Sequence, residues 1–231
     1  RVLAGRDFIK PGTSAADENG HGTHVAGIIA ANANNKIGTA GLAPSALILP
    51  VRVLDASGSG DNAGVAQGII WAAQQGVHVI NLSLGATRSD TAIKAAVAYA
   101  QSRNVVVVAA AGNESCRLLL GSPTAYPAAY PGVLGVGAIS SDRRIASYSS
   151  CGSWVDVVAP GSGIVSTMIA SPDSGLGCPR GTLYCTLSGT SMATPYTSAA
   201  AALEIARLKR KFNQASIVSR LQSTATDLGT A

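Results

Sequence analysis

The sequence predicts an α/β fold with a central, mostly parallel β-sheet flanked by helices in three layers, and three observations lead to this. Several short runs of β-branched and small apolar residues show no polar alternation, as in strands covered on both faces. Alanine-rich helical stretches lie between these runs, and such alternation is typical of a parallel sheet. Finally, 47% of the 231 residues are hydrophobic but only 4% are aromatic, so small side chains must fill the core.

Five apolar runs are predicted as buried strands, because each is continuous. They are Leu47–Leu54, Val77–Leu84, Val105–Ala111, Val133–Ile139 and Val155–Ala159. Segments 115–131 and 170–187 are rich in Gly, Pro, Ser and Cys and are predicted as surface loops. In such folds the functional groups gather at the carboxyl edge of the sheet.

Five helices are predicted between and beside these strands. They cover His21–Ala31, Asn62–Gln75, Asp90–Ser102, a stretch from Ser191 through Leu203 to about Lys211, and Gln214–Ser223. Ser89 or Asp90 is available as an N-cap for the third of them. Pro195 is expected within the first turn of the fourth, where a missing N–H costs little.

Composition and charge exclude several classes of protein. No linker or repeat divides the chain, so residues 1–231 are expected to form a single domain. The longest apolar run, Val105–Ala111, is far shorter than the roughly 18 residues of a membrane span, so a soluble chain is expected. The net charge of +5 includes one dense cluster, Arg207, Lys209, Arg210 and Lys211. Because it lies near a predicted helix end and beside no aromatic platform, it predicts a helix-dipole contact, rather than a nucleic-acid or membrane-surface patch.

The four cysteines form an even set without metal-like C-x-x-C spacing, which favours two disulfides and an exported protein. Three connectivities are open. Cys178 with Cys185 is the most local closure, and it would leave Cys116 with Cys151. The sequence begins at Arg1 without a recognisable export signal, so we expect that the signal was removed or that the sequence is incomplete.

Ser191 follows a glycine-containing turn and precedes an apolar helix. Free backbone N–H groups and the positive end of the helix dipole would stabilise an oxyanion that develops beside its hydroxyl. The alternative is an ordinary N-cap serine.

Two of the three histidines, His21 and His24, lie three residues apart on one predicted helix. A zinc site is disfavoured because no H-E-x-x-H pattern and no third ligand is evident. His21 has glycine on both sides and is therefore the more accessible candidate base, whereas His24 and His78 are predicted to be structural.

Asn113 ends the long run of Val and Ala that begins at Val105. Its amide would therefore lie at the carboxyl end of a central strand. It could donate to an oxyanion, as acyl-transfer chemistry requires, or simply occupy a turn after Gly112.

Three segments, Gly20–Gly27 (GHGTHVAG), Ala109–Glu114 (AAAGNE) and Gly189–Pro195 (GTSMATP), together resemble the subtilisin-type serine proteases. The similarity extends over nearly the whole chain, through Arg1–Ile9, Val51–Gly60, Asn81–Gly85 and Thr224–Gly229, and RVLAGRDF is most similar to the thermitase branch. The resemblance implies the three-layer subtilisin-like fold and a secreted serine endopeptidase. Ser191 would be the nucleophile that forms the acyl-enzyme, His21 the general base, and Asn113 a donor in the oxyanion hole together with the Ser191 N–H.

The resemblance also implies how substrate binds. Gly58-Ser59-Gly60 and Ser83-Leu84-Gly85 would hold an extended polypeptide between them, and Ala110, Ala111 and Gly112 would form the wall of a pocket for a large apolar or aromatic residue. The partners expected are polypeptide substrates and a propeptide or protein inhibitor, with no nucleic acid and no membrane, and the protein is expected to be a monomer.

No cofactor is expected for the chemistry, but the loop of residues 32–40 resembles a structural calcium loop of the family. The ligands implied are the Asn35 side chain and the carbonyls of Ile37 and Thr39. The usual aspartate ligand of the family has no counterpart in this loop.

The chain departs from the family pattern at the third member of the triad. The family places an Asp at the end of a first strand roughly thirty residues before the histidine, and only Asp7, Asp17 and Glu18 precede His21. Asp173-Ser174-Gly175 has the right tripeptide in the wrong order. We therefore expect the domain to lack its first strand and its final segment. The alternative is a catalytically impaired homologue that binds peptides.

A second departure follows Pro195, where the sequence reads Tyr196-Thr197-Ser198-Ala199 and the family usually has His-Val-Ala-Gly.

Overall fold

Short strands alternate with helices along the chain, whose computed structural model describes residues 1–116, 121–170, 176–209 and 211–229. The elements are β1 (Arg6–Asp7), α1 (His21–Ala30), β2 (Val51–Arg52), α2 (Asn62–Gln74), β3 (Val79–Leu82), α3 (Thr91–Ser102), β4 (Val106–Ala110), β5 (Leu134–Ile139), β6 (Val157–Pro160), β7 (Ile164–Thr167), β8 (Tyr184–Leu187), α4 (Thr190–Arg207) and α5 (Gln214–Thr224).

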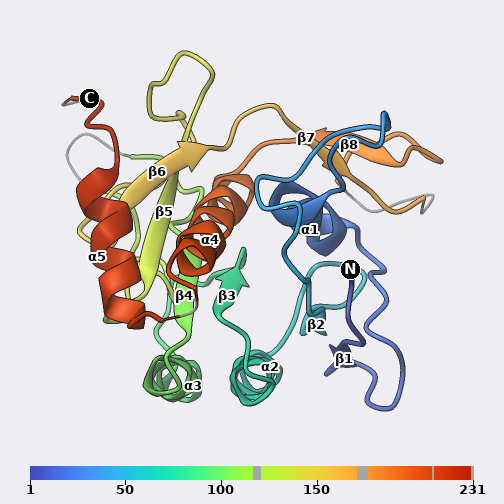
Figure 1. Ribbon diagram of the computed structural model, residues 1–231, viewed down its shortest axis with the longest axis horizontal. Helices are drawn as coiled ribbons and strands as arrows, with labels where there is room; N and C mark the ends of the chain where they lie inside the picture. Colours follow the sequence, from blue (N-terminus) through green and yellow to red (C-terminus); the bar gives the residue numbers. More distant parts are fainter. Residues whose placement is uncertain (117–120, 171–175, 210, 230–231) are drawn as a thin grey trace.

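The strands pair in three groups (Figure 1). β3, β4, β5 and β6 form a parallel sheet in that order, with Val79 opposite Val106 and Val108 opposite Leu134. β1 and β2 form a separate parallel pair, and β7 and β8 an antiparallel hairpin. Within the described ranges no strand pairing joins β2 to β3, although α2 connects them. The predicted α/β class with a parallel sheet is confirmed.

Strand β4 is apolar throughout because helices cover both of its faces. Val107 and Ala109 pack in one cluster with apolar residues of α2 and α3. Val106 and Val108, which point the opposite way, pack in a second cluster with residues of α4 and α5. Figure 1 shows the resulting layers, with the sheet between these two pairs of helices. This arrangement carries the carboxyl end of β4 toward the amino end of α4.

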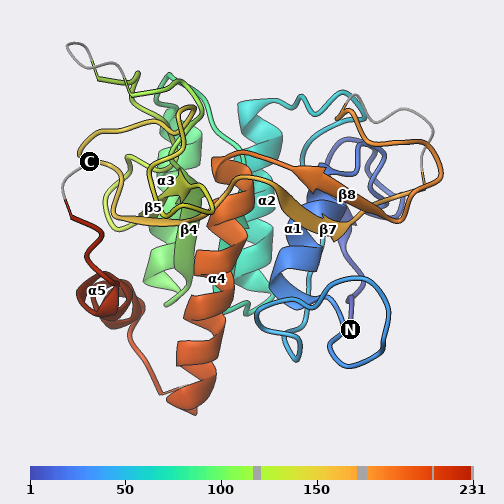
Figure 2. The same cartoon turned by 90° about the horizontal axis from the view of Figure 1, so that it is seen from above.

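Helix α1 lies outside these two pairs. It packs beside α4 through Val25 and Ile28, which share an apolar cluster with Ile164 of β7 and Met192 of α4. Figure 2 shows α1 and α4 side by side, with the β7–β8 hairpin next to α1.

Three expected elements differ from those observed. The run Leu47–Leu54 contains only a two-residue strand, because Pro50 interrupts it and Ile48 forms only an isolated bridge with Val2. The predicted loop 170–187 ends in β8, whose residues complete the hairpin with β7. Residues 171–175 of that loop, and residues 117–120 of the other predicted loop, lie outside the described residues.

The third difference concerns α4, which begins at Thr190 and ends at Arg207. Pro195 therefore lies in the second turn, and its missing N–H leaves the carbonyl of Ser191 without a helical partner. After Leu208 the chain leaves the helix because Lys209 has a φ of 50°. Arg207 pairs with Glu204 at 2.6 Å, so the described part of the basic cluster is partly neutralised, and Arg210 lies outside the described residues.

Both disulfides that the cysteine spacing favoured are present. Cys178 pairs with Cys185, and Cys116 pairs with Cys151 across 35 positions of sequence. In the described part of the chain, no helix has the length and apolar character needed to cross a membrane.

Ile217 anchors α5 to the sheet. It is 0% exposed, and it packs in the cluster that contains Val106 and Val108. We predict that Ile217→Ala lowers the free energy of unfolding by about 2–5 kcal/mol, because it removes buried methyl groups and leaves a cavity. Leu203→Ala on α4 is the control, since Leu203 is 46% exposed and its loss should cost far less. Urea unfolding measures both, and equal losses would contradict this role of Ile217.

Candidate active site

Ser191 is the second residue of α4, where the chain turns from β8 into the helix. Its side chain is half-buried, and its Oγ donates to the carbonyl oxygen of Ser83 at 3.4 Å. Ser83 directly follows β3, so the carboxyl end of this strand meets the amino end of α4. The hydroxyl of Ser191 therefore lies at the predicted edge of the sheet, beside the free N–H groups of a helix terminus.

Asn113 follows the carboxyl end of β4, and its amide has a fixed orientation. The Asn113 Oδ1 accepts from the Thr190 N–H at 2.9 Å and from the Thr190 hydroxyl at 3.0 Å. With the oxygen committed, the Nδ2 group must point elsewhere, and it makes no hydrogen bond with any described residue. It faces Gly189, where an added Cβ would lie 3.5 Å from Nδ2. The predicted oxyanion donor therefore keeps a donor group available beside Ser191.

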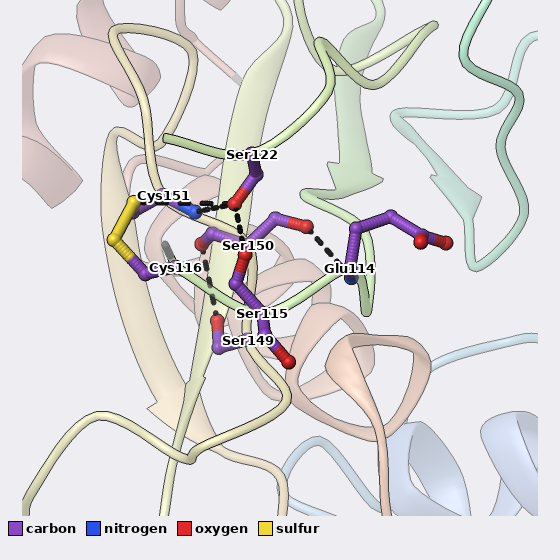
Figure 3. The surroundings of a disulfide bond; sticks show 7 residues. All are labelled: Glu114, Ser115, Cys116, Ser122, Ser149, Ser150 and Cys151. Carbon is purple, nitrogen blue, oxygen red and sulfur yellow. Dashed lines mark hydrogen bonds between the residues drawn. A yellow bond between two sulfur atoms is a disulfide. The ribbon is translucent and has the colours of Figure 1, made fainter. Parts of the chain in front are cut away.

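A disulfide and several hydrogen bonds hold the segment that carries Asn113 (Figure 3). The Ser150 N–H donates to the Gly112 carbonyl at 3.0 Å, and the Ser150 Oγ accepts from the Glu114 N–H at 3.1 Å. The disulfide between Cys116 and Cys151 joins the same two stretches of chain covalently, a few residues after Gly112 and directly after Ser150. Gly112 has a φ of 102°, and a Cβ there would lie 2.9 Å from the Ser150 Oγ, so glycine is required on both grounds.

Ser122 adds two hydrogen bonds between the same two stretches of chain. Its hydroxyl donates to the Ser115 carbonyl at 2.6 Å and accepts from the Cys151 N–H at 2.9 Å.

His21 is the first residue of α1 and is half-buried. Burial, and next the neighbouring His24, lower the pKa of the His21 imidazole below the ordinary 6.5, while the Asp17 carboxylate opposes this shift. The imidazole is consequently neutral at pH 7, as a general base must be. Among the described residues no hydrogen bond joins this ring to Ser191. His21 and Ser191 each lie at the amino end of a helix, and these two helices, α1 and α4, pack side by side.

The other two histidines have structural surroundings. His24 is 0% exposed, and its Nε2 lies 3.1 Å from the Ile164 carbonyl and 3.0 Å from the Cys185 carbonyl. His78 precedes β3, where its carbonyl accepts from the Val106 N–H and its ring packs against Phe212. No group of three potential metal-binding side chains occurs in the part of the chain that the structure describes.

The acidic residues before His21 are all held by other groups. Asp17 accepts from the N–H groups of Asn19, Gly20 and Thr23 and from the Thr23 hydroxyl. Burial raises the pKa of Asp17, but these hydrogen bonds outweigh that effect and keep the pKa below its ordinary value. Asp17 therefore caps the turn that leads into α1.

Asp7 is also buried, and it accepts from the Ile9 and Lys10 N–H groups, the Thr13 hydroxyl and the Arg52 guanidinium. Glu18 pairs with Arg52 and Lys10. Among the described contacts, neither these carboxylates nor Asp17 accept a hydrogen bond from the His21 ring. Asp173-Ser174-Gly175 lies outside the described residues.

The predicted substrate segments have different surroundings. Gly58-Ser59-Gly60 is exposed in a tight turn, in which Asp55 accepts from the N–H groups of Ser57 and Ser59 and Gly58 has a φ of 79°. Ser83-Leu84-Gly85 leads into Ala86, whose N–H and carbonyl both pair with Tyr126.

The predicted pocket wall is mostly enclosed. Ala110 and Ala111 are buried, and the Ala111 carbonyl accepts from the Trp154 indole at 3.1 Å. Gly112 alone of the three is half-buried.

The predicted calcium ligands Asn35, Ile37 and Thr39 line one hollow of about 270 Å³, away from Ser191. The Asn35 Oδ1 accepts from the Ile37 N–H at 3.0 Å. The hollow is also lined by Arg1, whose guanidinium donates to the Asn32 side chain. The described lining contains no carboxylate, so its oxygen atoms are all uncharged.

Sequence reasoning missed three supporting residues, Thr190, Asn81 and Ser198. Thr190 orients Asn113 as described above. Asn81 and Ser198 form a hydrogen-bonded chain that ends at Ser83. The sequence signal that could have found such residues is a polar residue inside an otherwise apolar run, such as Asn81 within Val77–Leu84.

Comparison with known proteins is consistent with this geometry. The profile described as the subtilase family matches residues 4–231. The thermophilic serine proteinase of Bacillus sp. (strain AK1) is 48% identical over 204 residues, covering 88% of this chain and 47% of the relative. Subtilisin E of Bacillus subtilis (strain 168) is 45% identical, covering 99% of this chain and 56% of the relative. The chain therefore spans about half the length of these two curated relatives.

Solved structures show the same likeness. A cold-adapted subtilisin-like serine proteinase has a TM-score of 0.83 at 36% identity, covering 99% of this chain and 76% of that one. Sphericase has a TM-score of 0.81 at 33% identity, covering 97% of this chain and 76% of the sphericase chain. Because the family profile spans nearly all of the sequence and the fold agrees, the chain belongs to the subtilase family.

Proposed function

We propose that the protein is a secreted serine endopeptidase that cleaves extended polypeptides through an acyl-enzyme on Ser191. One observation carries this proposal: Thr190 holds the Asn113 oxygen, so that the amide nitrogen is left as a donor beside the nucleophile. An oxyanion donor needs such a free N–H group beside the nucleophile. The family membership supports the same reaction.

In the proposed reaction, Ser191 attacks the scissile carbonyl while the neutral imidazole of His21 accepts the hydroxyl proton. The negative charge that develops on the carbonyl oxygen is stabilised by the Asn113 Nδ2 and by the backbone N–H of Ser191. His21 then returns the proton to the amine that leaves as the C–N bond breaks. A water molecule, deprotonated by His21, cleaves the acyl-enzyme ester, and the Ser191 hydroxyl regains its proton. Catalytic hydrogen bonds often tighten only when substrate binds, so His21 and Ser191 need not be bonded to each other without it.

We further propose that a carboxylate outside these 231 residues orients His21, within one peptidase domain that also includes further segments. The proposal is supported by the two parallel groups of strands, since the described edges of β2 and β3 are unpaired although α2 connects them. One additional parallel strand would satisfy both edges and would end near the carboxyl edge that holds Ser191. The engagement of Asp7, Asp17 and Glu18 elsewhere also favours an external carboxylate.

A second candidate function is a peptide-binding module without turnover. The observation that favours it is that no described carboxylate accepts a hydrogen bond from the His21 ring. In this case the segments Gly58–Gly60 and Ser83–Gly85 would still bind an extended peptide by backbone pairing.

Export and monomeric state are proposed together with the reaction. Two disulfides in one small domain favour an oxidising compartment. The proposed partners are polypeptide substrates and an inhibitory propeptide or protein that would occupy the same strand-binding segments.

We also propose that calcium binds at the loop of residues 32–40, where the Asn35 side chain and the Ile37 and Thr39 carbonyls would hold it. The described oxygens are uncharged, and Arg1 brings a positive charge into the same hollow. Calcium sites with few charged ligands are weak, so any effect here is expected to be on stability and modest in size.

A fluorophosphonate that labels active serines tests the reaction. We expect the full-length protein to be labelled on Ser191 and to hydrolyse peptides, and Ser191→Ala to lose both properties, because the nucleophile is gone. Ser188→Ala is the control, since among the described residues the Ser188 hydroxyl bonds to the Gly163 N–H, away from Asn113. An unlabelled protein that binds peptides saturably without turnover would support the second candidate instead.

The pH dependence of kcat/KM tests the role of His21. A protonated imidazole cannot accept the serine proton, so activity should fall as the pH drops through the pKa of His21. Burial lowers this pKa, whereas the proposed orienting carboxylate would raise it. Asp17→Asn removes a charge that favours the imidazolium, so it should move this acid limb to lower pH. Glu18→Gln should leave the limb in place, because Glu18 faces Arg52 and Lys10. A profile without an acid limb, or a limb that Asp17→Asn leaves in place, would contradict the assignment.

Thermal unfolding in calcium series tests the metal site. We expect Tm to be insensitive to micromolar calcium and to rise only when calcium reaches the order of 10⁻³ M, because the described ligands carry no charge. Asn35→Ala should abolish the rise. A rise already at micromolar calcium would show that charged ligands from elsewhere complete the site.

A further inference from the structure

Ser198 lies in the segment where the sequence departs from the family pattern after Pro195. It lies inside α4 and is only 2% exposed. A buried hydroxyl in a helix usually bonds to a carbonyl of the preceding turn. Ser198 instead donates its hydroxyl to the Asn81 Oδ1 on β3 at 2.7 Å. The side chain therefore links α4 to the carboxyl end of the neighbouring strand.

The bond from Ser198 fixes the direction of the following bonds. Since the Asn81 oxygen accepts from Ser198, the Asn81 Nδ2 is turned toward Ser83 and donates to its Oγ at 3.0 Å. The Ser83 hydroxyl accepts this bond and has its own proton left to donate. It donates that proton to the carbonyl oxygen of Ser191 at 2.8 Å. All three bonds therefore run in one direction, from α4 through β3 to the nucleophile.

Pro195 explains why the last bond is available. In an α-helix the Ser191 carbonyl would accept from the N–H of residue 195, and proline has none. The Ser83 hydroxyl supplies the missing donor. The carbonyl of the nucleophile is thus held by a side chain of another element rather than by its own helix.

We propose that Ser198 and Asn81 are positioning residues for catalysis, which act through Ser83 to fix the backbone of Ser191 and thereby the direction of its Oγ. The inference rests on the proposed function of Ser191 as nucleophile. Ser83 holds Ser191 at two points, because its carbonyl also accepts from the Ser191 Oγ. Small errors in the position of a reacting atom lower the rate of the chemical step.

Steady-state kinetics of Ser198→Ala in the full-length protein tests the proposal. Alanine is a good helix former, and the change removes only the hydroxyl, so the helix should persist. One lost hydrogen bond corresponds to a fall in kcat of about threefold to tenfold. KM should change less than kcat, because the Ser198 side chain bonds to Asn81 and not to a peptide-binding segment. Asp156→Ala is the control. It removes a carboxylate that accepts from the Gly135 N–H at the amino edge of the sheet, and should lower stability without changing kcat.

A double-mutant cycle separates positioning from general stability. If Ser198 acts through Ser83, then Ser198→Ala combined with Ser83→Ala should cost no more in kcat than Ser83→Ala alone. Asn81→Asp should also lower kcat, since a carboxylate at the Nδ2 position accepts the Ser83 proton and withdraws it from Ser191. Additive losses, or an unchanged kcat in Ser198→Ala, would overturn the proposal.

Fluorophosphonate labelling of the wild type distinguishes this failure from that of the proposed function. A wild type that is labelled and turns over, combined with a Ser198→Ala variant of equal labelling rate, overturns the positioning role alone. A wild type that is neither labelled nor active overturns the proposed function and the positioning role together. A labelling rate that falls in parallel with kcat supports both.

Discussion

The junction between the carboxyl end of β4 and the amino end of α4 is the constraint on which the site depends. A single oxygen, Oδ1 of Asn113, accepts from both the backbone and the side chain of Thr190 and so joins a fully buried strand to a helix on its face. Because β4 is covered on both sides, its end cannot move without disturbing the core. The packing of the sheet therefore determines the position of Ser191.

Sequence reasoning recovered the repeating part of this architecture. The run from Val105 to Ala111 is apolar because both faces of β4 are covered, and that cause leaves a direct trace in sequence. The β7–β8 hairpin left a weaker trace, since Tyr184–Leu187 is short and lies beside glycine, proline and cysteine. The predicted helix start at Ser191 lies one residue after the observed start at Thr190.

The site itself was only partly predictable for a related reason. His21, Asn113 and Ser191 belong to short motifs in which residue type and spacing carry the chemistry, although their catalytic roles remain predictions. Thr190, Asn81 and Ser198 act through contacts between residues far apart in sequence, with separations of 77 and 117 positions for two of the bonds. No local pattern records such contacts. The buried polar groups nevertheless had to find partners, so each polar residue inside an apolar element was a place to look.

The bond between Cys116 and Cys151 affects what happens when a peptidase cuts the chain. A peptide bond cut anywhere between these two cysteines leaves both pieces covalently joined. Such a nicked molecule would keep its apparent size on a gel until it is reduced, and would differ in intact mass by a single water. The hydrogen bonds of Ser150 to Gly112 and Glu114 would still hold the two pieces in register beside Asn113. Integrity of the chain therefore has to be judged after reduction.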